Sequence, residues 1–411
     1  MLPTPSSEDD LLLTKQSVVD YKKNQKARAI LGHLYQQGSR TLAQLAETLH
    51  TSIPSITGLV EELLEQGWVN AVGTASGNNG RRPVLFSLNA GEHYVLILDS
   101  TTHDTRLMIV NPRREVIFQR VVDTHLENSA QFLTFLATFV TESLAESGLS
   151  HDQIMAVGLT LPGLIDTRRG VNLTYPNLNL TDQPFTDWLE QQVGWPVFLI
   201  NDTKATALGE NRFGGGQGKN HVLSINIDWG LGLGIIINGE VFQGASGFAG
   251  ELGHIQVDPN GELCHCGKVG CLDTITSASS LVRHMQRAVE AGQQTRLAAF
   301  RHDLNQINIT HIIEAAHEGD SFAIDLLHET GYQLGKGLSI AVNLFNPEVI
   351  IIDGVLAQGS MFITNPIRQA INKHCLSGFR RDLIVEVTKL DGAAKWLGTH
   401  AYVMEKVLAS Y

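Results

Sequence analysis

The sequence predicts an α/β protein that begins with a winged helix-turn-helix and continues into two similar α/β subdomains. Three observations predict this fold. Three short amphipathic helices and a hairpin pattern occupy the first ninety residues, a three-strand pattern occurs twice in the remainder, and α/β segments follow each copy. We expect domains at residues 1–89, at 90–200 together with a C-terminal helix at 390–411, and at 201–389.

The composition is that of a globular protein. The chain has 411 residues, of which 43% are hydrophobic, and its formal net charge is −12. This length fits two or three domains, and the apolar content excludes disorder as the dominant state. No segment approaches about 20 uninterrupted apolar residues, and the acidic N-terminus lacks the features of a secretory signal. We therefore expect a soluble cytoplasmic protein without membrane insertion.

Three helices are expected before the hairpin. Apolar residues at helical spacing indicate a first helix around residues 27–34. Thr41 and Gln44 form a capping-box pattern, which predicts that a second helix begins there. Ser52 can cap a third helix, and Pro54 is tolerated in the first turn of that helix. This order of elements is typical of a helix-turn-helix.

A hairpin completes the winged form of this domain. Residues 68–72 and 84–88 alternate like strands, and a Gly/Asn-rich turn at 73–80 joins them. In such domains the third helix enters the major groove, and arginines of the wing suit phosphate or minor-groove contacts. The predicted DNA contacts are Ser52, Ser55, Thr57, Gly58, Arg81 and Arg82. The alternative is a small helical domain used for dimerisation.

The charge is distributed unevenly along the chain. Residues 11–82 contain eight cations and five anions, a net charge of +3, so the rest of the chain carries −15. Because an acidic body repels nucleic acid, we expect DNA contacts to be confined to the N-terminal segment. An ordinary mixed surface is the alternative interpretation of this charge distribution.

Two copies of a three-strand pattern follow the winged helix. The expected strands are at 94–99, 105–110 and 116–122, and again at 222–227, 232–237 and 240–243. A helix at 332–344 and a buried strand at 349–352 come later. Repeated strand meanders with α/β segments between them predict two subdomains facing across a cleft, as in the actin-like ATPase fold of sugar kinases.

A group of metal-ligating residues lies in the second copy. Its members are His254, Cys264, Cys266 and Cys271. One imidazole and three thiolates suit tetrahedral zinc, and a site filled entirely by protein ligands indicates a structural metal. Three crowded cysteines among only four favour a metal site in a reducing compartment over a disulfide scaffold. Buried free thiols with a surface histidine are the alternative. His265 is a weaker ligand candidate, and the isolated Cys375 is expected to be a small core or surface residue rather than a ligand.

Several motifs together resemble a known family. They are the runs at residues 161–166, 176–178, 201–210, 250–254 and 264–273, which begin with Leu-Pro-Gly and end with Cys-His-Cys-Gly-Lys-Val-Gly-Cys-Leu-Asp. They are similar to the ROK family of repressors, open reading frames and kinases. The N-terminal winged helix makes the resemblance greatest to the repressor branch, which includes the xylose and N-acetylglucosamine repressors and Mlc.

This resemblance implies a sugar-binding site. The residues that it assigns to the sugar are Gly163, Asn177, Asn201, Asp202, Glu251, His254 and Asp273. Carboxylates and amides bind vicinal hydroxyls in fixed pairs, so these residue types suit the chemistry. Asp202 matches the family's catalytic base, and Asp273 stands where the family usually has Glu. A capping or turn role is the alternative for each of these residues, notably for Asn201 and Asp202 before a helix.

Three departures from the family pattern affect the nucleotide site. The first hairpin turn, at residues 99–103, lacks the glycines of Asp-x-Gly-Gly-Thr. The second turn begins Asp228-Trp229-Gly230 instead of Gly-Thr-Gly, although Gly232 and Gly234 keep the spacing. Asp353-Gly354 replaces the later Gly-Gly. Phosphoryl transfer depends on close backbone approach to the phosphates, so we expect no bound nucleotide and no catalytic residue.

The sequence therefore predicts a DNA-binding repressor that senses a sugar or sugar phosphate and controls genes of carbohydrate uptake or catabolism. The expected partners are double-stranded operator DNA and a second copy of the chain, in a homodimer or homotetramer. Structural zinc is the expected cofactor. One alternative is an ATP-dependent sugar kinase with Asp202 as its catalytic base. Another is a regulator that answers to a transporter subunit, as Mlc does.

Overall fold

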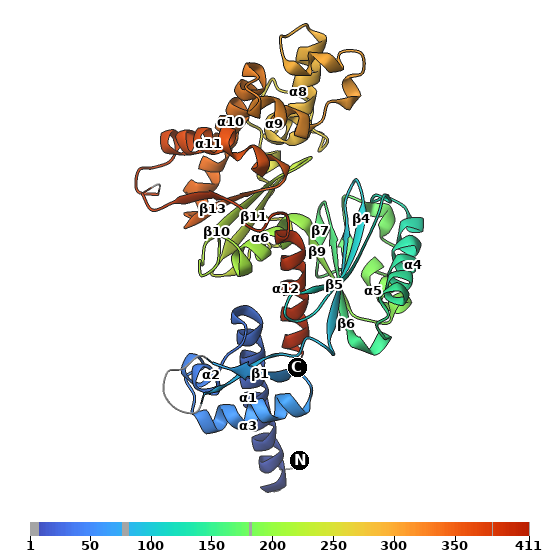
Figure 1. The fold of residues 1–411 in the computed structure, drawn as a ribbon, viewed down its shortest axis with the longest axis vertical. Helices are drawn as coiled ribbons and strands as arrows, with labels where there is room; N and C mark the ends of the chain where they lie inside the picture. The colour runs from blue at the N-terminus through green and yellow to red at the C-terminus, as the bar shows by residue number, and fades with distance from the viewer. Residues whose placement is uncertain (1–7, 76–81, 181–182, 380, 411) are drawn as a thin grey trace, which may run out of the picture. The chain divides into compact units, whose positions relative to one another are not determined.

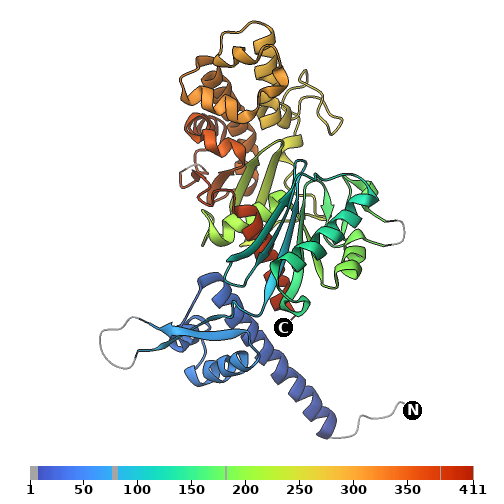
Figure 2. The ribbon, with the colours of Figure 1, turned by 45° about the vertical axis from the view of Figure 1, so that its right-hand side comes forward.

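The computed structural model describes residues 8–75, 82–180, 183–379 and 381–410. The chain divides into two compact units. Unit 1 comprises Met1–Leu159, Phe185–Phe198 and Tyr402–Tyr411, and unit 2 comprises Thr160–Pro184 and Leu199–Ala401. Figures 1 and 2 show their elements from two directions. Among the described residues, none of the helices combines the length and the hydropathy that a bilayer crossing requires.

The predicted winged helix-turn-helix is the first part of unit 1. It consists of α1 (Glu8–Gln37), α2 (Leu42–Thr48), α3 (Ile53–Glu65), β1 (Val69–Thr74) and β2 (Val84–Leu88). The capping box is present, because Thr41 Oγ1 accepts from Gln44 N–H at 3.3 Å and Gln44 Oε1 accepts from Thr41 N–H at 2.9 Å. Ser52 caps α3 with Pro54 in the first turn, as predicted. The first helix is much longer than its apolar segment indicates.

The apolar face of α3 holds this domain together. Ile56, Leu59, Val60 and Leu63 of α3 are buried, as are Ile30, Leu31 and Leu34 of α1. The spacing of three and four residues places each set on one side of its helix. β1 and β2 pair antiparallel, with Val69 opposite Leu88 and a bulge between Ala71 and Gly73. The hairpin therefore closes the small core that the two helices form.

A five-stranded sheet follows, in the order β5-β4-β3-β6-β9. Its strands are β3 (Tyr94–Ser100), β4 (Thr105–Val110), β5 (Val116–Val122), β6 (Ile154–Leu161) and β9 (Val197–Asn201). β3, β4 and β5 form an antiparallel meander. The helices α4 (Ala130–Ser147) and α5 (Phe185–Val193) lie side by side against this sheet (Figures 1 and 2).

The second sheet repeats this arrangement, in the order β12-β11-β10-β13-β14. Its strands are β10 (Val222–Ile227), β11 (Leu231–Ile237), β12 (Glu240–Val241), β13 (Val349–Asp353) and β14 (Ile384–Val387). β10, β11 and β12 form the antiparallel meander, and β13 and β14 continue the sheet in parallel. In both sheets the meander is followed by two further strands. The predicted duplication of a three-strand pattern is thus confirmed.

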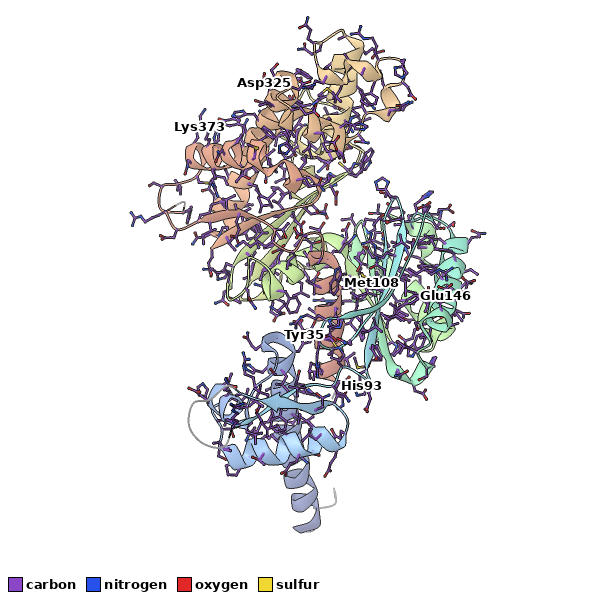
Figure 3. The ribbon with its side chains drawn as sticks, in the orientation of Figure 1. Tyr35, His93, Met108, Glu146, Asp325 and Lys373 are labelled. Carbon is purple, nitrogen blue, oxygen red and sulfur yellow. The ribbon has the colours of Figure 1, made fainter. Side chains whose placement is uncertain are left out.

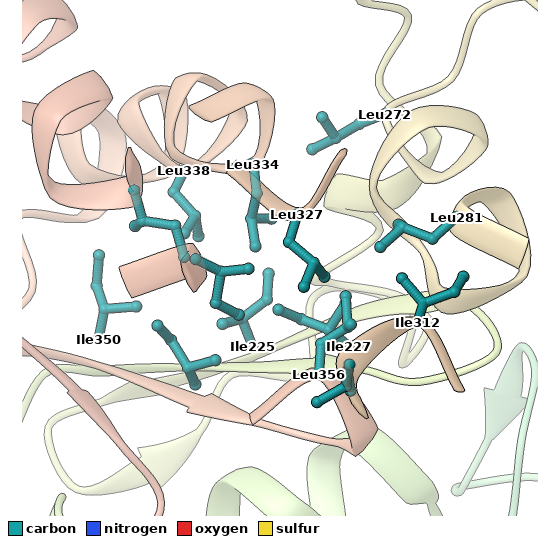
Figure 4. Packing of buried hydrophobic residues seen from close by; sticks show 14 of the residues in the cluster. Ile225, Ile227, Leu272, Leu281, Ile312, Leu327, Leu334, Leu338, Ile350 and Leu356 are labelled. Carbon is teal, nitrogen blue, oxygen red and sulfur yellow. The ribbon is translucent and has the colours of Figure 1, made fainter. Parts of the chain in front are cut away.

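Helices cover both faces of the second sheet. They are α6 (Asp202–Phe213), α7 (Asp273–Thr276), α8 (Ala278–Glu290), α9 (Ile309–His317), α10 (Ser321–Phe345) and α11 (Ser360–His374), whereas α12 (Ala394–Ala409) begins in close contact with α6 at Gly209. Ile225 and Ile227 of β10 pack with Leu334 and Leu338 of α10 in the largest core (Figure 4). The alternate residue Val222 packs instead with Ala207 of α6. Burying one such side chain contributes about 1.5–3 kcal/mol, so both faces stabilise the sheet.

Short elements carry several of the predicted site residues. A small hairpin consists of β7 (Ile165–Asp166) and β8 (Val171–Asn172), and the 3₁₀ helices η2 (Pro176–Leu178) and η3 (Leu252–His254) follow in unit 2. The remaining 3₁₀ helices are η1 (His151–Gln153), η4 (Arg296–Phe300), η5 (Leu304–Gln306) and η6 (Val355–Gly359).

Candidate metal and ligand site

The four predicted metal ligands come together in unit 2. The ligand atoms of His254, Cys264, Cys266 and Cys271 all lie within 4.8 Å of one another. Cys264 Sγ is 3.6 Å from His254 Nδ1, and Cys266 Sγ is 3.7 Å from Cys271 Sγ. Around tetrahedral zinc, with zinc–sulfur bonds of about 2.3 Å and zinc–nitrogen bonds of about 2.0 Å, ligand atoms are about 3.6–3.8 Å apart. The cluster is therefore consistent with a zinc site.

The surroundings of the thiols also fit a cation. Burial raises the pKa of the Cys271 thiol to about 12 and raises the pKa of Cys264 as well. Thiolates at these positions are therefore costly unless a nearby cation compensates their charge. Cys264, His265 and Asp273 form an overlapping group of three candidate ligands, whereas Cys375 is buried in the core below α10. Cys375 is thus a core residue, one of the two placements expected for it.

The N-terminus of α6 carries Asn201 and Asp202. Asn201 caps the helix, because its Oδ1 accepts from Lys204 N–H at 3.1 Å. Its Nδ2 donates to Gly163 O at 3.1 Å, so the same side chain also holds the segment that contains Gly163. Asp202 Oδ1 accepts from Thr203 N–H at 2.7 Å. The capping role that was the alternative for Asn201 is therefore present. The contact of its side chain with Gly163 is a second role that capping does not explain.

The segment around Gly163 is shaped by a buried asparagine that the sequence analysis missed. Asn172 Oδ1 accepts from the N–H groups of Thr174 and Tyr175, and its Nδ2 donates to Pro162 O at 3.0 Å. A Cβ at Gly163 would lie 2.7 Å from Thr174 Cβ, so the packing of this segment leaves no room for a side chain at Gly163. Several Asn and Thr residues in a short stretch were the only signal of this network.

Tyr175 and Asn177 lie at the end of this segment. Burial raises the pKa of the half-buried Tyr175, and the negative charge of Asp202 raises it further. An electrostatic effect of this kind places the phenol in the neighbourhood of Asp202. Asn177 is exposed in η2, two residues beyond Tyr175. Tyr175 therefore joins the candidate ligand site, although no motif in the sequence indicates it.

Glu251 and His254 connect the metal cluster to the ligand site. Glu251 Oε2 is 3.8 Å from His254 Nε2, and the Glu251 side chain is 49% exposed. Burial raises the pKa of Glu251, whereas the charge of Lys204 opposes that shift. Burial lowers the pKa of His254, which favours the neutral imidazole that metals bind. A metal held by His254 Nδ1 would therefore also fix the position of the ring beside Glu251.

Asp273 is the most buried of the predicted sugar-binding carboxylates. Its exposed fraction is 6%, and its Oδ1 accepts from Leu231 N–H at 2.7 Å. Leu231 begins β11, directly after the turn that contains Trp229. One carboxylate oxygen of Asp273 is therefore engaged with the protein. The sugar contact predicted for Asp273 would therefore be made through its second carboxylate oxygen, Oδ2.

Most of the predicted DNA-contacting residues lie on one side of α3. Ser52 and Gly58 are exposed, and Ser55 and Thr57 are half-buried. Ser52 Oγ accepts from Ser55 N–H at 3.4 Å, and Thr57 Oγ1 donates to Ile53 O at 2.9 Å. These residues lie on the side of α3 that faces away from its buried side chains.

The wing contributes one described arginine. Arg82 is exposed and stands two residues before β2, whereas Arg81 lies outside the described residues. One acidic residue of α3, Glu62, has a partner in α1, because Lys23 Nζ forms a 2.7 Å ion pair with it. The first turn of α3 contains no acidic residue.

Two arginines of the β4–β5 turn contact the winged helix, which the sequence analysis did not predict. Arg113 donates through Nε to Leu88 O and through Nη2 to Asn70 Oδ1, each at 3.0 Å. Arg114 donates to Tyr35 O at the end of α1, and its guanidinium lies 5.5 Å from the centre of the Tyr35 ring. Tyr35 is marked in Figure 3.

A second contact joins the winged helix to the following sheet. The rings of Trp68 and His93 are stacked, with their centres 4.6 Å apart. His93, also marked in Figure 3, directly precedes β3. Within unit 1 the winged helix is thus held to the β3–β5 meander at two places.

The family of the chain follows from comparisons with known proteins. The ROK family model matches residues 96–406, and the MarR family model matches residues 24–71. The xylose repressor of Caldicellulosiruptor bescii is 29% identical over 90% of this chain and 92% of its own length. The DNA-binding transcriptional dual regulator NagC of Escherichia coli is 28% identical over 95% of both chains.

Solved structures agree with this assignment. A ROK family transcriptional regulator, a homologue of the E. coli Mlc protein, has a TM-score of 0.79 with 29% identity and covers 93% of this chain and 96% of its own. A ROK family glucokinase from Streptomyces griseus, in complex with glucose and AMPPNP, has a TM-score of 0.65 with 30% identity over 75% of this chain and 98% of its own. The repressors thus match over more of the chain than the kinase does. The helix-turn-helix is of the MarR type, and the prediction of a transcriptional repressor with a sugar-kinase fold is confirmed: the chain belongs to the ROK family.

Proposed function

We propose that this protein binds operator DNA through its winged helix, senses a sugar in unit 2, and controls genes of carbohydrate uptake or catabolism. One observation carries the proposal. The turn Asn201–Lys204 contacts the segment that contains Gly163 and the loop that leads to Glu251 and His254, so predicted sugar-binding residues from distant parts of the sequence meet. Relatives matched over nine-tenths of the chain are repressors of sugar genes by name.

We assign a structural role to zinc in this proposal. His254, Cys264, Cys266 and Cys271 would hold it, and the ion would supply a cross-link between the segment of Glu251 and the segment of Asp273. Four protein ligands complete a tetrahedron, which is typical of structural rather than catalytic zinc. His254 belongs to both groups of residues, so loss of the metal should also disturb Glu251.

The first hairpin turn supports the absence of kinase activity. Thr101 Oγ1 accepts from the N–H groups of His103 and Asp104, at 3.0 and 3.1 Å. Backbone N–H groups in such a turn are the donors that would otherwise hold a phosphate. In this chain they bind a hydroxyl of the same turn, which makes them poorer phosphate donors.

The second turn and β13 support the same conclusion. Trp229 is 56% exposed where the family has a small residue, and burial together with the charge of Asp228 raises the pKa of Asp353. A pair of carboxyl groups is a poor environment for phosphates. The retained Gly232 and Gly234 have a packing role, because a Cβ at either position would collide with Thr203 or Ala207 of α6.

The remaining parts of the proposal concern assembly. We propose the domain division 1–89, 90–200 with 390–411, and 201–389, and a homodimer or homotetramer that brings two winged helices to one operator. A symmetric repressor dimer reads two half-sites about one helical turn of DNA apart. A sugar that changes the conformation of unit 2 would change the population of DNA-binding-competent dimers. Regulation by a transporter subunit instead of a sugar is the second candidate, favoured if DNA binding answers to no small molecule.

Selection of genomic fragments with the zinc-loaded protein tests this function. We expect enrichment of a palindromic site and a change in affinity when one sugar of a panel is added. Arg82→Ala should weaken DNA binding and reduce by about one the slope of log affinity against log salt concentration. Arg296→Ala removes an exposed arginine of unit 2 and should change neither quantity. Failure to bind any fragment at low salt would overturn the proposal. ATP turnover with a sugar, abolished in Asp202→Asn, would support the kinase instead.

A further inference from the structure

Lys204 is a buried cation within the candidate sugar site. It stands in the first turn of α6, and only 5% of the residue is exposed. Its Nζ donates to Gln243 Oε1 at 3.1 Å and also to Gly247 O. Lysine is rarely buried unless its ammonium group is paired, so this position must provide enough partners to offset desolvation.

The two acceptors of Lys204 lie in a loop that carries sugar-site residues. Gly247 lies four residues before Glu251 along the chain, and Gln243 lies four residues before Gly247. Three residues before Lys204, Asn201 holds Gly163 through its side-chain amide. Two side chains at the start of α6 therefore each hold one segment of the site. Asn201 holds the segment that contains Gly163, and Lys204 holds the loop of residues 243–247.

Lys204 also balances the negative charge of this region. Burial lowers the pKa of Lys204, and the negative charge of Glu251 opposes that shift. Lys268 is exposed and donates to His254 O at 2.7 Å. Asp202 and Asp273 add two further carboxylates, and three thiolates more than neutralise a zinc dication. The described residues of the site thus have little positive charge available for a bound anion.

We propose that Lys204 is a positioning residue that fixes the 243–247 loop and supplies the counter-charge of Glu251, so that the site takes an uncharged sugar rather than a sugar phosphate. This inference rests on the proposed function, because it concerns the same site. A neutral hydroxyl-rich ligand exchanges hydrogen bonds with Asp202, Glu251 and Asn201 at no cost in repulsion. A phosphate ester would bring about two negative charges among carboxylates whose buried counter-ion, Lys204, already donates to Gln243 and Gly247.

Calorimetric titration of the full-length, zinc-loaded protein tests the inference. The probes are D-glucose, D-xylose and N-acetyl-D-glucosamine, with glucose 6-phosphate and N-acetylglucosamine 6-phosphate beside them. We expect a neutral sugar to bind more tightly than any phosphate ester. Lys204→Met should weaken that binding about ten- to hundredfold, because a charged hydrogen-bond donor is lost.

Companion variants separate positioning from simple stability. Lys204→Arg keeps the charge and should restore part of the affinity, whereas Lys204→Gln keeps only a neutral donor and should restore less. Lys389→Met removes an exposed lysine of the same unit and should bind the sugar as the parent protein does. Zinc content and sugar-free DNA binding should stay unchanged in the Lys204 variants. If Lys204→Met does not fold, the comparison of Arg with Gln still tests the charge.

The outcomes distinguish this inference from the proposed function. Tighter binding of a phosphate ester, lost in Lys204→Met, would make Lys204 an anion-binding residue and overturn the inference while leaving a sugar-responsive repressor intact. Unchanged sugar affinity in Lys204→Met would overturn the positioning role alone. Binding of no probe by the parent protein, with DNA binding intact, would overturn the sugar-sensing function together with the inference.

Discussion

Replacement of Arg113 by Met should release the winged helix from the first sheet. Arg113 is half-buried in the β4–β5 turn and donates to Leu88 O and Asn70 Oδ1, each at 3.0 Å. A hydrogen bond to a charged group contributes about 1.5–3 kcal/mol. With partial exposure taken into account, losing both bonds should cost about 2–4 kcal/mol of docking free energy, a shift of about 30- to 1000-fold in the docked population.

The turn itself should survive the Arg113→Met substitution. Asn111 Oδ1 accepts from the N–H groups of Arg113 and Glu115, and these bonds involve only the backbone of residue 113. The variant therefore removes the interdomain bonds while the β4–β5 turn keeps its shape. Methionine retains most of the aliphatic length of the arginine, which limits the loss of packing.

Hydrogen exchange measures the release directly. We expect faster exchange of β1, of β2 and of residues 89–93 in Arg113→Met, with unchanged exchange in β10 and β13, and a smaller effect of the sugar on DNA affinity. Arg106→Met is the matched control, because Arg106 lies in the adjacent strand and pairs with Asp104 at 3.8 Å within the same sheet. Equal exchange of the wing strands in the parent protein and in Arg113→Met would refute the docking role of Arg113.

Two further predictions concern the metal and the buried charge of unit 2. Cys266→Ser should lose zinc, measured by metal content, and lose sugar response with it; a metal-free variant that still responds would contradict the link between His254 and Glu251. Glu210 is fully buried, and burial raises its pKa above the ordinary value of 4.5. The folded state therefore binds more protons than the unfolded state, so the free energy of unfolding falls as pH rises through the raised pKa. Glu210→Gln can still bond Thr388 and Gly215 N–H, so thermal unfolding between pH 5 and 8 should show a flatter dependence in this variant, and an unchanged slope would rule out Glu210 as its cause.

Local patterns predicted the fold well because neighbouring residues determine most of it. The bounds of β4, β5 and β10 agree with the predicted strands, and the capping box of Thr41 depends on one residue three positions away. Helix lengths were less predictable. The helix expected at 332–344 begins at Ser321, because Asp320 caps it ahead of the strongly apolar part.

The candidate site likewise has residues that the sequence predicts and residues that only the structure shows. The metal ligands lie close together in sequence, and their spacing alone indicates the cluster. Arg113 and Lys204 bond to residues between 25 and 43 positions away in the sequence. Tyr175 is affected by the charge of Asp202, which periodicity does not predict either. A lysine on the buried side of a helix and an arginine in a turn have many possible partners. Only the tertiary arrangement selects among them.

Asp273 connects the proposed metal segment with the turn that contains Trp229. It follows Cys271 by two residues, and its Oδ1 accepts from Leu231 N–H at the end of the turn that contains Trp229. That turn is held a second time, because Ala278 N–H donates to Asp228 O at 3.0 Å. A carboxylate committed to the backbone of this turn has one oxygen left for a sugar, and it is one methylene shorter than the glutamate usual in the family. The zinc segment should therefore stabilise both the residues proposed to bind the sugar and the turn that contains Trp229, which we propose is unsuited to a nucleotide phosphate.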